Sequence, residues 1–399
     1  MATAPSPAQL SQANAAARAM ILARGLKMMQ VIASGVLANP TQGSNIINIS
    51  PRPVGLGQKF TVEITASISA GASAAINATN FNVANLLSEV VFYDLQNYTR
   101  IQTPGWHLAF LSSVKESLPF GSAVTTDLPI KYGNNLNVAA SGAGGIGSGN
   151  GICFAPSSIA ATSVGVVKMT YEIPLAYSDR DLRGAVYLGV VNSTGLLKLT
   201  VNSNPVVAST ADATNAVYQS AGATTGAITS LSYTVYQHWW DQLPQGRSGP
   251  ILPAQDLSTV YELKNTTLTG MAANQDFPIP YANFRDFLST FLIWDNNGTV
   301  AAGTDINYFA LQSANFTNVW KIDPFLAALF TRKLIKSDFP TPAWYFSHRN
   351  KPLSTIQYGN LELILNENIN AGAGQQAIIA WEDFGLQNTI TGAGSLPAG

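Results

Sequence analysis

The chain has few charged residues and almost no cysteine, and each shortage excludes classes of protein. Asp, Glu, Lys and Arg make up 11% of its 399 residues, against about 25% in a typical soluble protein. The 21 basic and 22 acidic residues leave a net charge of −1, so no overall field attracts nucleic acid or an acidic substrate. Cys153 is the single cysteine, which excludes an intrachain disulfide framework and a cysteine-rich metal site.

Long apolar runs are missing as well. No stretch reaches the roughly 18 consecutive apolar residues of a membrane-spanning helix. Disorder is disfavoured, because 10% aromatic and 46% hydrophobic residues supply enough apolar mass for a core. So few charges leave a surface that is either covered by neutral polar residues or hidden against other molecules. Composition therefore favours a protein that assembles, with a secreted β protein as the alternative.

Motifs that carry catalysis are weak. Gly142, Gly144 and Gly147 match the dinucleotide pattern G-x-G-x-x-G, but no helix signal follows them, so a surface loop is the better interpretation. Three histidines lie in separate segments without metal-ligand spacing, namely His107, His238 and His348. The apolar neighbours of His107 favour a packed, hydrogen-bonded histidine.

Two aspartates in YSDRDLRG (177–184) are the best candidates for catalytic or calcium-binding carboxylates. Asp179 and Asp181 alternate with Arg180 and Arg183, so a turn cross-linked by salt bridges explains them better than glycoside hydrolysis or Ca²⁺ binding. The aromatic run YTVYQHWW (233–240) keeps sugar stacking open, whereas nucleic-acid stacking lacks interleaved basic residues. The sequence predicts no catalytic residue, no metal and no cofactor.

The N-terminal region contains no acidic residue before Glu63. Within it, residues 9–38 are rich in Ala, Leu, Met and Gln and predict one amphipathic helix. A secretory signal is disfavoured, because Arg24 and Lys27 interrupt its apolar core. A cleaved transit peptide, a structural helix docked on its own domain and a basic arm lying on an anionic bilayer all stay open.

From about residue 45 the chain consists of short runs rich in Val, Ile, Thr, Tyr and Phe, separated by Gly, Pro, Asn and Ser. One later helix is predicted over 322–340, with Asp323 as N-cap, Pro324 at the first position and Pro340 at the end. Many short strands with little helix indicate β-sandwiches or barrels. The predicted strands are 59–69, 88–94, 165–173, 196–201, 228–237, 258–265, 288–296, 356–365 and 376–384.

A domain boundary is predicted at 241–254, where three prolines and two glycines lie between two strands. The similar segments NLLSEVVFYDLQN (85–97) and RDFLSTFLIWDNNG (285–298) suggest two related halves. The low-complexity segment 140–151 predicts a loop, and the residues after about 385 predict an extended arm.

An ordered set of short motifs resembles the major capsid protein of tectivirus-type phages, which are tailless icosahedral bacteriophages with an internal membrane. The set extends over about 55–365, and its order makes the resemblance specific. The motifs are PGWHL (104–108), TDLPIKYG (126–133), IPLAYSDRDLRGAV (173–186), LSYTVYQ (231–237), DQLP (241–244), ILPAQDLSTVYEL (251–263), GTDINY (303–308), ANF (314–316), KIDP (321–324), SDFP (337–340), RNKP (349–352) and IQYGN (356–360).

The resemblance implies an all-β fold of two eight-stranded viral jelly rolls, a double jelly roll, with an N-terminal helix and short helical insertions. It implies a capsid protein without enzymatic activity, made in the host cytoplasm and located in the virion capsid. The expected parts are an N-terminal helical arm facing the membrane (1–44), a first jelly roll (45–244), a second jelly roll (245–384) and a C-terminal arm (385–399).

The implied partners are further copies of the chain, first in a pseudo-hexagonal homotrimer and then in neighbouring capsomers of an icosahedral shell. Minor capsid and vertex proteins and the internal membrane are further implied partners, with no direct contact to nucleic acid. Arg18, Arg24 and Lys27 in the N-terminal arm are the candidates for contact with lipid headgroups. The alternative function is a secreted or particle-borne carbohydrate-binding β-sandwich protein.

Overall fold

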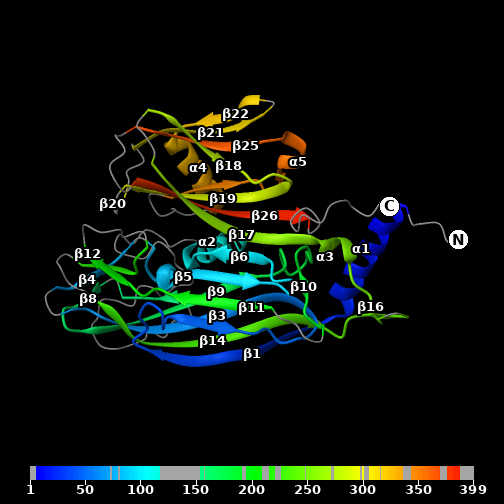
Figure 1. Cartoon of the computed structure of the whole chain (residues 1–399), viewed down its shortest axis with the longest axis horizontal. Helices are drawn as coiled ribbons and strands as arrows, with labels where there is room; N and C mark the ends of the chain where they lie inside the picture. The colour runs from blue at the N-terminus through cyan, green and yellow to red at the C-terminus, as the bar shows by residue number, and fades with distance from the viewer. Residues whose placement is uncertain are drawn as a thin grey trace.

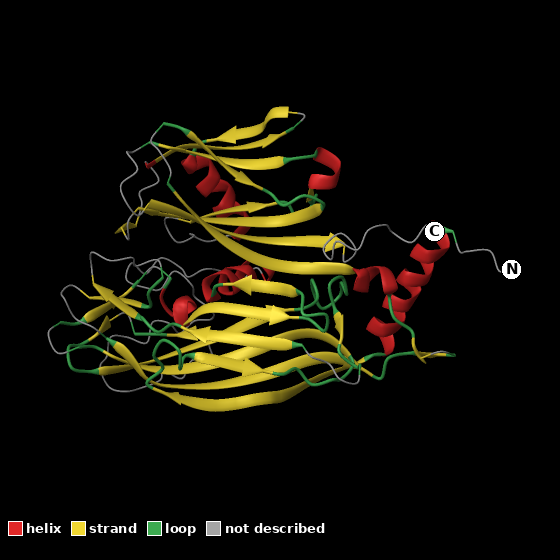
Figure 2. Cartoon of the chain, viewed as in Figure 1, coloured by secondary structure: helices red, strands yellow, loops and turns green. Residues whose placement is uncertain are grey.

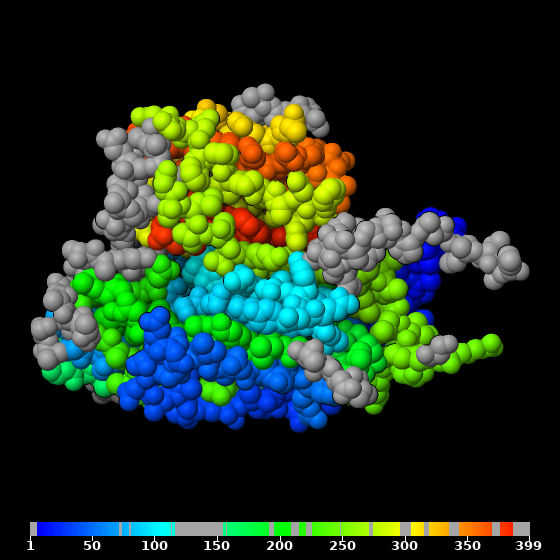
Figure 3. Space-filling model, viewed as in Figure 1, coloured from blue at the N-terminus to red at the C-terminus, as the bar shows by residue number. Residues whose placement is uncertain are grey.

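The computed structural model shows two β-sandwiches stacked on each other, with helices along their sides (Figures 1 and 2). The two sandwiches form adjoining masses, the N-terminal half below and the C-terminal half above (Figure 3). The residues described are 6–71, 74–79, 81–116, 153–156, 158–190, 195–208, 215–220, 226–247, 249–270, 274–296, 299–300, 305–314, 316–335, 343–368 and 375–386.

The first sandwich packs two sheets face to face. One sheet has the order β1-β14-β3-β9 and consists of β1 (Leu26–Ala38), β3 (Leu56–Ser69), β9 (Val164–Pro174) and β14 (Ala227–Asp241). The facing sheet has the order β2-β11-β5-β6 and consists of β2 (Ile46–Ile49), β5 (Leu87–Tyr93), β6 (Thr99–Thr103) and β11 (Leu196–Val201). Helix α2 (Gly105–Glu116) follows β6 and packs on β9 and β5.

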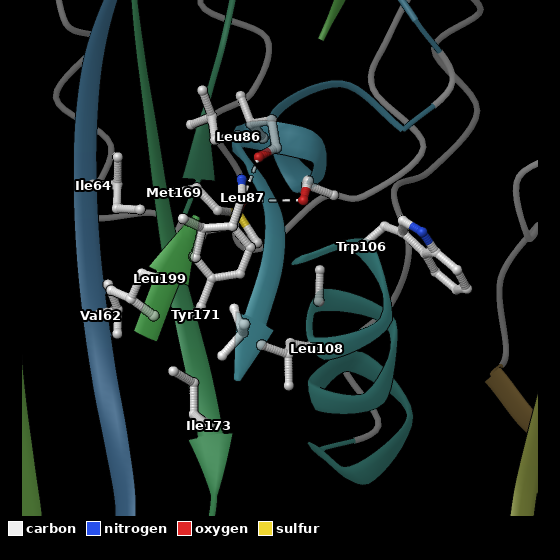
Figure 4. Packing of buried hydrophobic residues seen from close by; sticks show 14 of the residues in the cluster. Val62, Ile64, Leu86, Leu87, Trp106, Leu108, Met169, Tyr171, Ile173 and Leu199 are labelled. Carbon is white, nitrogen blue, oxygen red and sulfur yellow. Dashed lines mark hydrogen bonds between the residues drawn. The ribbon is translucent and has the colours of Figure 1, made fainter. Parts of the chain in front are cut away.

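Alternating side chains form the core of this sandwich. In β3, Phe60, Val62 and Ile64 are fully buried while the residues between them are partly exposed, which is the period-two pattern of a strand with one buried face. Phe60 meets Phe92 of the facing sheet with ring centroids 5.6 Å apart. Figure 4 shows the side chains of β3 and β9 directed toward β5, with Leu108 of α2 beside them.

The second sandwich repeats this plan. One sheet has the order β17-β26-β19, with β23 also paired to β19, and consists of β17 (Thr259–Thr269), β19 (Arg285–Asn296), β23 (Ala343–Ser347) and β26 (Gln375–Leu386). The other has the order β18-β25-β21-β22 and consists of β18 (Asp276–Pro280), β21 (Ile306–Ser313), β22 (Phe316–Ile322) and β25 (Leu361–Glu367). Helix α4 (Pro324–Ile335) follows β22, as α2 follows β6.

The two halves correspond strand by strand. By chain order and sheet position, the sheet β1-β14-β3-β9 corresponds to β17-β26-β19-β23. The facing sheet β2-β11-β5-β6 corresponds to β18-β25-β21-β22, and helix α2 corresponds to α4. Each half is therefore a jelly roll of two facing sheets, and the expected double jelly roll is confirmed. The similar segments at 85–97 and 285–298 belong to β5 and β19, which do not correspond, so that similarity does not trace the repeat.

Short elements complete the fold. A small sheet contains β4 (Ile76–Ala78), β8 (Ser158–Ile159), β12 (Val206–Ala208) and β13 (Tyr218–Ser220). Strands β7 (Cys153–Phe154), β10 (Val186–Tyr187), β20 (Thr299–Val300) and β24 (Leu353–Ser354) extend the larger sheets. The hairpin β15–β16 (Gln245–Gly246, Gly249–Pro250), the 3₁₀ helix η1 (Asn82–Leu86) and the helices α3 (Ala254–Ser258) and α5 (Thr355–Tyr358) lie in connections.

The single helix predicted over residues 9–38 is wrong in its second half. Helix α1 (Pro7–Arg24) begins at the N-cap Ser6 and ends at Gly25, and Leu26–Ala38 is instead strand β1. β1 pairs antiparallel with β14 from Leu26 to Ala38. Pairing with a neighbouring strand outweighs the helix propensity of an Ala- and Met-rich segment, because propensity amounts to only a few tenths of a kcal/mol per residue.

One further prediction needs correction. The strand predicted at 356–365 begins only at Leu361, because Thr355–Tyr358 forms the short helix α5, which ends at Gly359 with a positive φ of 73°. The helix predicted at 322–340 is confirmed from Pro324 to Ile335, and Asp323 accepts a hydrogen bond from the Leu326 N–H at its start. Residues 336–340, with the predicted end at Pro340, lie outside the described residues.

The two jelly rolls share one continuous sheet. β6 of the first pairs parallel with β17 of the second at Ile101–Leu263 and Gln102–Lys264, so the sheet runs from β2 to β20 across the junction. Strands β19 and β26 are buried on both faces, because Phe291 faces the core of the first jelly roll and its neighbour Leu292 faces that of the second. Burial on both faces accounts for the unbroken apolar run FLIW in β19.

Candidate interaction surfaces

The aspartate pair at 179–181 forms a salt-bridged turn, as expected. Asp181 accepts hydrogen bonds from the Arg183 guanidinium at 2.7 to 3.1 Å. Asp179 points elsewhere and accepts from Gln58 and, at 3.1 Å, from Lys27. Within the described part of the chain, no three His, Cys, Asp or Glu side chains are grouped so that they could hold a metal ion.

The histidines serve packing. His107 lies fully buried on α2, its Nδ1 is 2.6 Å from Thr103 Oγ1, and its ring meets Phe291 at 5.1 Å. Burial lowers the pKa of His107 to about 3, so the ring is neutral at physiological pH. His238 Nε2 is 2.9 Å from Thr61 Oγ1, and the backbone N–H of His348 donates to Leu288 O at 2.8 Å. The prediction of a packed His107 is confirmed.

The two tryptophans of the aromatic run 233–240 do not support the sugar-stacking hypothesis. Trp239 and Trp240 are both buried, at 5% and 1% exposure. Trp240 packs with Ile21 and Leu56 in a small core beneath α1. The glycine-rich segment 140–151 and residues 387–399 of the C-terminal arm lie outside the described residues.

The three basic candidates of the N-terminal arm differ in their surroundings. Arg18 donates to the buried Asp256 of α3 through Nε at 2.7 Å and through Nη2 at 2.6 Å. Lys27 forms an exposed ion pair with Asp179, and Arg24 is exposed at the end of α1. Among the described residues, no helix combines the length and the apolar character needed to cross a bilayer.

The Arg18–Asp256 contact fastens α1 to the linker between the jelly rolls. Asn14 Nδ2 also donates to Asp256, at 3.0 Å, while Asn14 Oδ1 accepts from the backbone of Gln255. Apart from Asn14, the residues that α1 buries are Ala17 and Ile21. A short polar clamp with two apolar contacts therefore fixes this helix, because hydrogen bonds to a buried charge are among the stronger ones.

A charged cluster ties α2 to the second jelly roll. Glu382 of β26 is fully buried and accepts from Arg349 at 2.7 Å, from Ser289 at 2.9 Å and from the Tyr261 hydroxyl at 2.6 Å. Lys115 of α2 lies 3.2 Å from the same carboxylate. Burial alone would raise the pKa of Glu382, but Lys115 and Arg349 outweigh it and lower that pKa to about 2.

A second buried cluster lies beside it on the same sheet. Arg285 bridges Asp383 at 2.7 Å and Glu262 at 2.8 Å, and Lys264 lies 2.6 Å from Glu262. The Tyr98 hydroxyl, from the turn before β6, donates to Glu262 at 2.6 Å. Lys115 and Tyr98 belong to the first jelly roll, whereas Glu382 and Glu262 belong to the second. Because buried networks depend on every partner being in place, both clusters hold the two jelly rolls in one register.

Helix α4 exposes an apolar face that its counterpart α2 buries. Trp106 and Phe110, the second and sixth residues of α2, are 2% and 0% exposed. Phe325 and Leu329, at the same positions of α4, are 73% and 45% exposed. On α2 this face is covered by the second jelly roll, where Phe110 meets Phe291 at 6.1 Å.

A hollow of about 540 Å³ lies between α4 and the strands β22 and β23, lined among others by Trp320, Phe330, Leu334 and Phe346. Large apolar side chains grouped on a surface mark an interaction site.

Sequence reasoning placed α4 but missed its exposure, and it did not predict α2 or the charged clusters at all. The unbroken run FLIW was the available signal that this sheet is covered on both faces.

Comparison with known proteins first defines a class. The crystal structure of the STIV MCP matches with a TM-score of 0.62 at 11% identity, over 94% of this chain and 100% of that chain. A chain from the atomic structure of Sulfolobus Turreted Icosahedral Virus matches with a TM-score of 0.61 at 12% identity, over 94% of each chain. The fold is that of the double jelly-roll viral major capsid proteins.

Sequence similarity then narrows the class to a family. The model for the P3 major capsid protein N-terminal part matches residues 8–243, and the model for the C-terminal part matches residues 258–397. Major capsid protein P3 of Enterobacteria phage PRD1 is 38% identical over 392 residues, which cover 97% of this chain and 95% of that protein. This chain belongs to the P3 major capsid protein family, the tectivirus family that the sequence motifs indicated. It is a family of structural capsid proteins and not an enzyme class.

Proposed function

We propose that this chain is the major building block of an icosahedral virion shell, assembled as homotrimers with a pseudo-hexagonal outline. The observation that carries self-association is the exposed apolar face of α4. In the first jelly roll the same face is covered by the following jelly roll, and a second copy of the chain offers the equivalent cover to α4. Burying an aromatic or leucine side chain contributes about 1.5–3 kcal/mol, so covering Phe325, Leu329 and Phe330 favours association.

The composition and the contacts of the candidate residues support the same role. A charge content of 11% suits a chain whose surface is largely covered in an assembly. The candidate carboxylates and histidines are used in a turn and in packing. We therefore propose a purely structural protein without catalysis, with neighbouring capsomers and with minor capsid and vertex proteins as further partners.

The proposed division of labour follows the family. Residues 45–244 and 245–384 form the jelly-roll body, joined by strand β1, and residues 385–399 bridge to neighbouring capsomers. We propose that α1 faces the internal membrane, with Arg24 and Lys27 contacting anionic headgroups. Arg18, the third candidate, is held by Asp256, so its contact with lipid requires release from that carboxylate.

Mass photometry of the purified chain tests the trimer. The expected species has about 127 kDa, three times the chain mass of 42.2 kDa. Phe325→Asp should shift the population toward monomer, because it places a charge in the apolar contact. Lys198→Asp, on the polar side of β11, serves as the matched control and should stay trimeric. A wild-type chain that is monomeric at micromolar concentration contradicts the proposal.

Vesicle flotation tests the membrane contact. Because β1 pairs with β14, the truncation must end before Leu26, and removal of residues 1–24 leaves the sheet intact. This variant should remain trimeric and bind anionic vesicles more weakly than the full chain. Equal binding of both proteins would reject the membrane-facing role.

A further inference from the structure

The junction between the two jelly rolls of one chain has a defined anatomy. The edge strand β6 and the helix α2 lie on one side, and the edge strand β17 with its sheet lies on the other. β17 pairs parallel with β6, and Phe291 of the same sheet covers α2. At this junction, the pairing of β6 with β17 and the covering of the apolar face of α2 thus occur together.

The chain also carries the two sides of this junction separately. β22 and α4 correspond to β6 and α2, and β1 with its sheet corresponds to β17. Figure 1 shows β22 and β1 at opposite ends of the stack. One chain therefore cannot bring these two sides together, although they consist of the elements that correspond to the two sides of the internal junction.

Strand β17 is buried at the internal junction, whereas the corresponding strand β1 is exposed in the single chain. This difference is expected if β1 is covered only in the assembly. Val260, Tyr261 and Leu263 of β17 are buried, at no more than 1% exposure. In the corresponding first half of β1, Met29 and Val31 are exposed, and no residue from Leu26 to Val31 is buried. Both faces of this segment are uncovered, whereas both faces of β17 are covered by the junction.

The edges of both strands are open for pairing. Within the described residues, β1 pairs along one edge only, with β14, and β22 pairs along one edge only, with β21. β1 has 13 residues and no proline. A long, apolar, unprotected edge strand is a template for strand addition, and natural proteins otherwise shield such edges.

We propose that β22 of one copy pairs parallel with β1 of the next copy, with the apolar face of α4 seated on the outer face of the β1 sheet. This inference rests on the proposed self-association and names its surfaces. The contact joins two different surfaces head to tail, and such contacts either close into a ring or continue as a filament. In a ring of such copies, every jelly-roll junction has the same anatomy, whether it lies within a chain or between chains.

The internal junction also predicts the register of the pairing. Gln102, the fourth residue of β6, pairs with Lys264, the sixth residue of β17. One residue separates each of β6 and β22 from the helix that follows it, so the next-to-last residues of the two strands correspond, Gln102 in β6 and Lys321 in β22. The sixth residue of β1 is Val31. The side chains of Lys321 and Val31 are both exposed in the single chain. Their Cα atoms are expected about 5 Å apart in the assembly, within disulfide range.

Cysteine cross-linking tests this contact. In a Cys153→Ser background, the double variant Lys321→Cys with Val31→Cys should form disulfide-linked dimers and trimers on mild oxidation, resolved on a non-reducing gel. The matched control combines Lys321→Cys with Ile46→Cys, because Ile46, on β2 of the opposite sheet, is 41% exposed and Val31 is 45% exposed. The control should give no covalent oligomer.

The outcomes separate this inference from the proposed function. A trimer by mass photometry that yields cross-links in the double variant and not in the control supports both. A trimer in which both variants stay uncross-linked, or cross-link equally, overturns the β1–β22 contact and leaves the trimer standing. A wild-type monomer overturns both.

A second variant guards against a failure of the cysteine chemistry. Val31→Asp should weaken trimer formation at least tenfold, because a charge enters an apolar strand contact, while Ile46→Asp leaves the trimer unchanged. Circular dichroism should show the same β content for both variants. An unchanged trimer in Val31→Asp contradicts the contact.

Discussion

Helices α2 and α4 hold the same place in two matching jelly rolls, yet one is a core helix and the other a surface helix. Both have 12 residues, and each follows the strand at the edge of its sheet, β6 before α2 and β22 before α4. The second position and the fourth to seventh positions are apolar in both helices, although the last three positions differ. The apolar face of α4 therefore has the composition of a buried surface, and the cover proposed for it is a second copy of the chain.

The strands β1 and β17 repeat this lesson at the other side of the junction. Each follows a helix, α1 before β1 and α3 before β17, and these two helices contact each other through Asp256. β17 is buried from Val260 to Leu263, whereas β1 is exposed from Leu26 to Val31. The five predictions below test this contrast between covered and uncovered elements, from the largest expected effect to the smallest.

The largest effect is expected from the covered helix. Phe110→Ala should lower the free energy of unfolding by about 4 kcal/mol, because a fully buried aromatic side chain is lost from the core. Leu329→Ala, at the same position of α4, should cost less than about 1 kcal/mol in the single chain and act mainly on association. Denaturant unfolding at low protein concentration measures both. Equal losses for the two variants would contradict the difference in cover.

The charged cluster at the covered junction should give the next effect. Glu382→Gln should lower the free energy of unfolding at pH 7 by about 3 kcal/mol, because Lys115 and Arg349 lose their counter-charge. Glu89→Gln, on a partly exposed face of β5, should cost no more than about 1 kcal/mol. Chemical denaturation of the two variants and the wild type measures the difference. A loss in Glu382→Gln as small as in the control would argue against the cluster as a stabilising contact.

The pH dependence of the same residue follows from its lowered pKa. The pKa of Glu382 is about 2 in the folded chain and 4.5 in its ordinary state. A carboxyl whose pKa falls on folding stabilises the fold above its ordinary pKa and loses that contribution as the pH falls from 4.5 to 2. The wild type should therefore lose about 3 kcal/mol more than Glu382→Gln over this interval. Parallel pH profiles of the two proteins would contradict this assignment.

A smaller and local effect is expected at α1. Asp256→Asn should weaken the clamp by about 1–2 kcal/mol, because Arg18 and Asn14 lose a charged acceptor. Trypsin should then cleave after Arg24 several-fold faster, with little change in the melting temperature of the body. Asp276→Asn, on β18 in the second jelly roll, is the control and should leave this cleavage unchanged. Unchanged cleavage in Asp256→Asn would show that other contacts hold α1.

The smallest effect is expected from Lys27→Ala. Its ion pair with Asp179 is exposed on both sides, and such pairs contribute between about 0 and 1 kcal/mol. Stability measured by denaturant unfolding should therefore stay within about 0.5 kcal/mol of the wild type, while binding to anionic vesicles falls. A large loss of stability would show that Lys27 has a structural role comparable to that of Arg18.

The sequence alone predicted the strands with strong alternation. β3, β9 and β11 appear within a few residues of their expected bounds, because one face of each is buried and the other is polar. The helix predicted over 9–38 was correct only to Arg24. Gly25 marks the true end, since its N–H caps the helix at Ile21 O, but only tertiary pairing turns the following residues into a strand.

The interaction surfaces were harder to predict from the sequence. The apolar residues of α4 have the spacing of any core helix, so periodicity cannot distinguish a face covered within the chain from one left uncovered. The partners of Glu382 come from α2, β17, β19 and the turn after β23, far apart in sequence, and each residue by itself has no signature. Only the strand-by-strand correspondence of the two jelly rolls shows that α4 and β1 lack the neighbours that cover α2 and β17.

The sheet shared by both jelly rolls has a consequence for attempts to divide the chain. A fragment ending at residue 247 would expose α2 and the open edge of β6, and the remaining fragment would expose the apolar side of β19 and β26. Each half would be poorly soluble alone, although the linker offers a natural cut site. Co-expressed halves should instead recombine through β6 and β17, and a protease nick in the linker should leave the molecule joined.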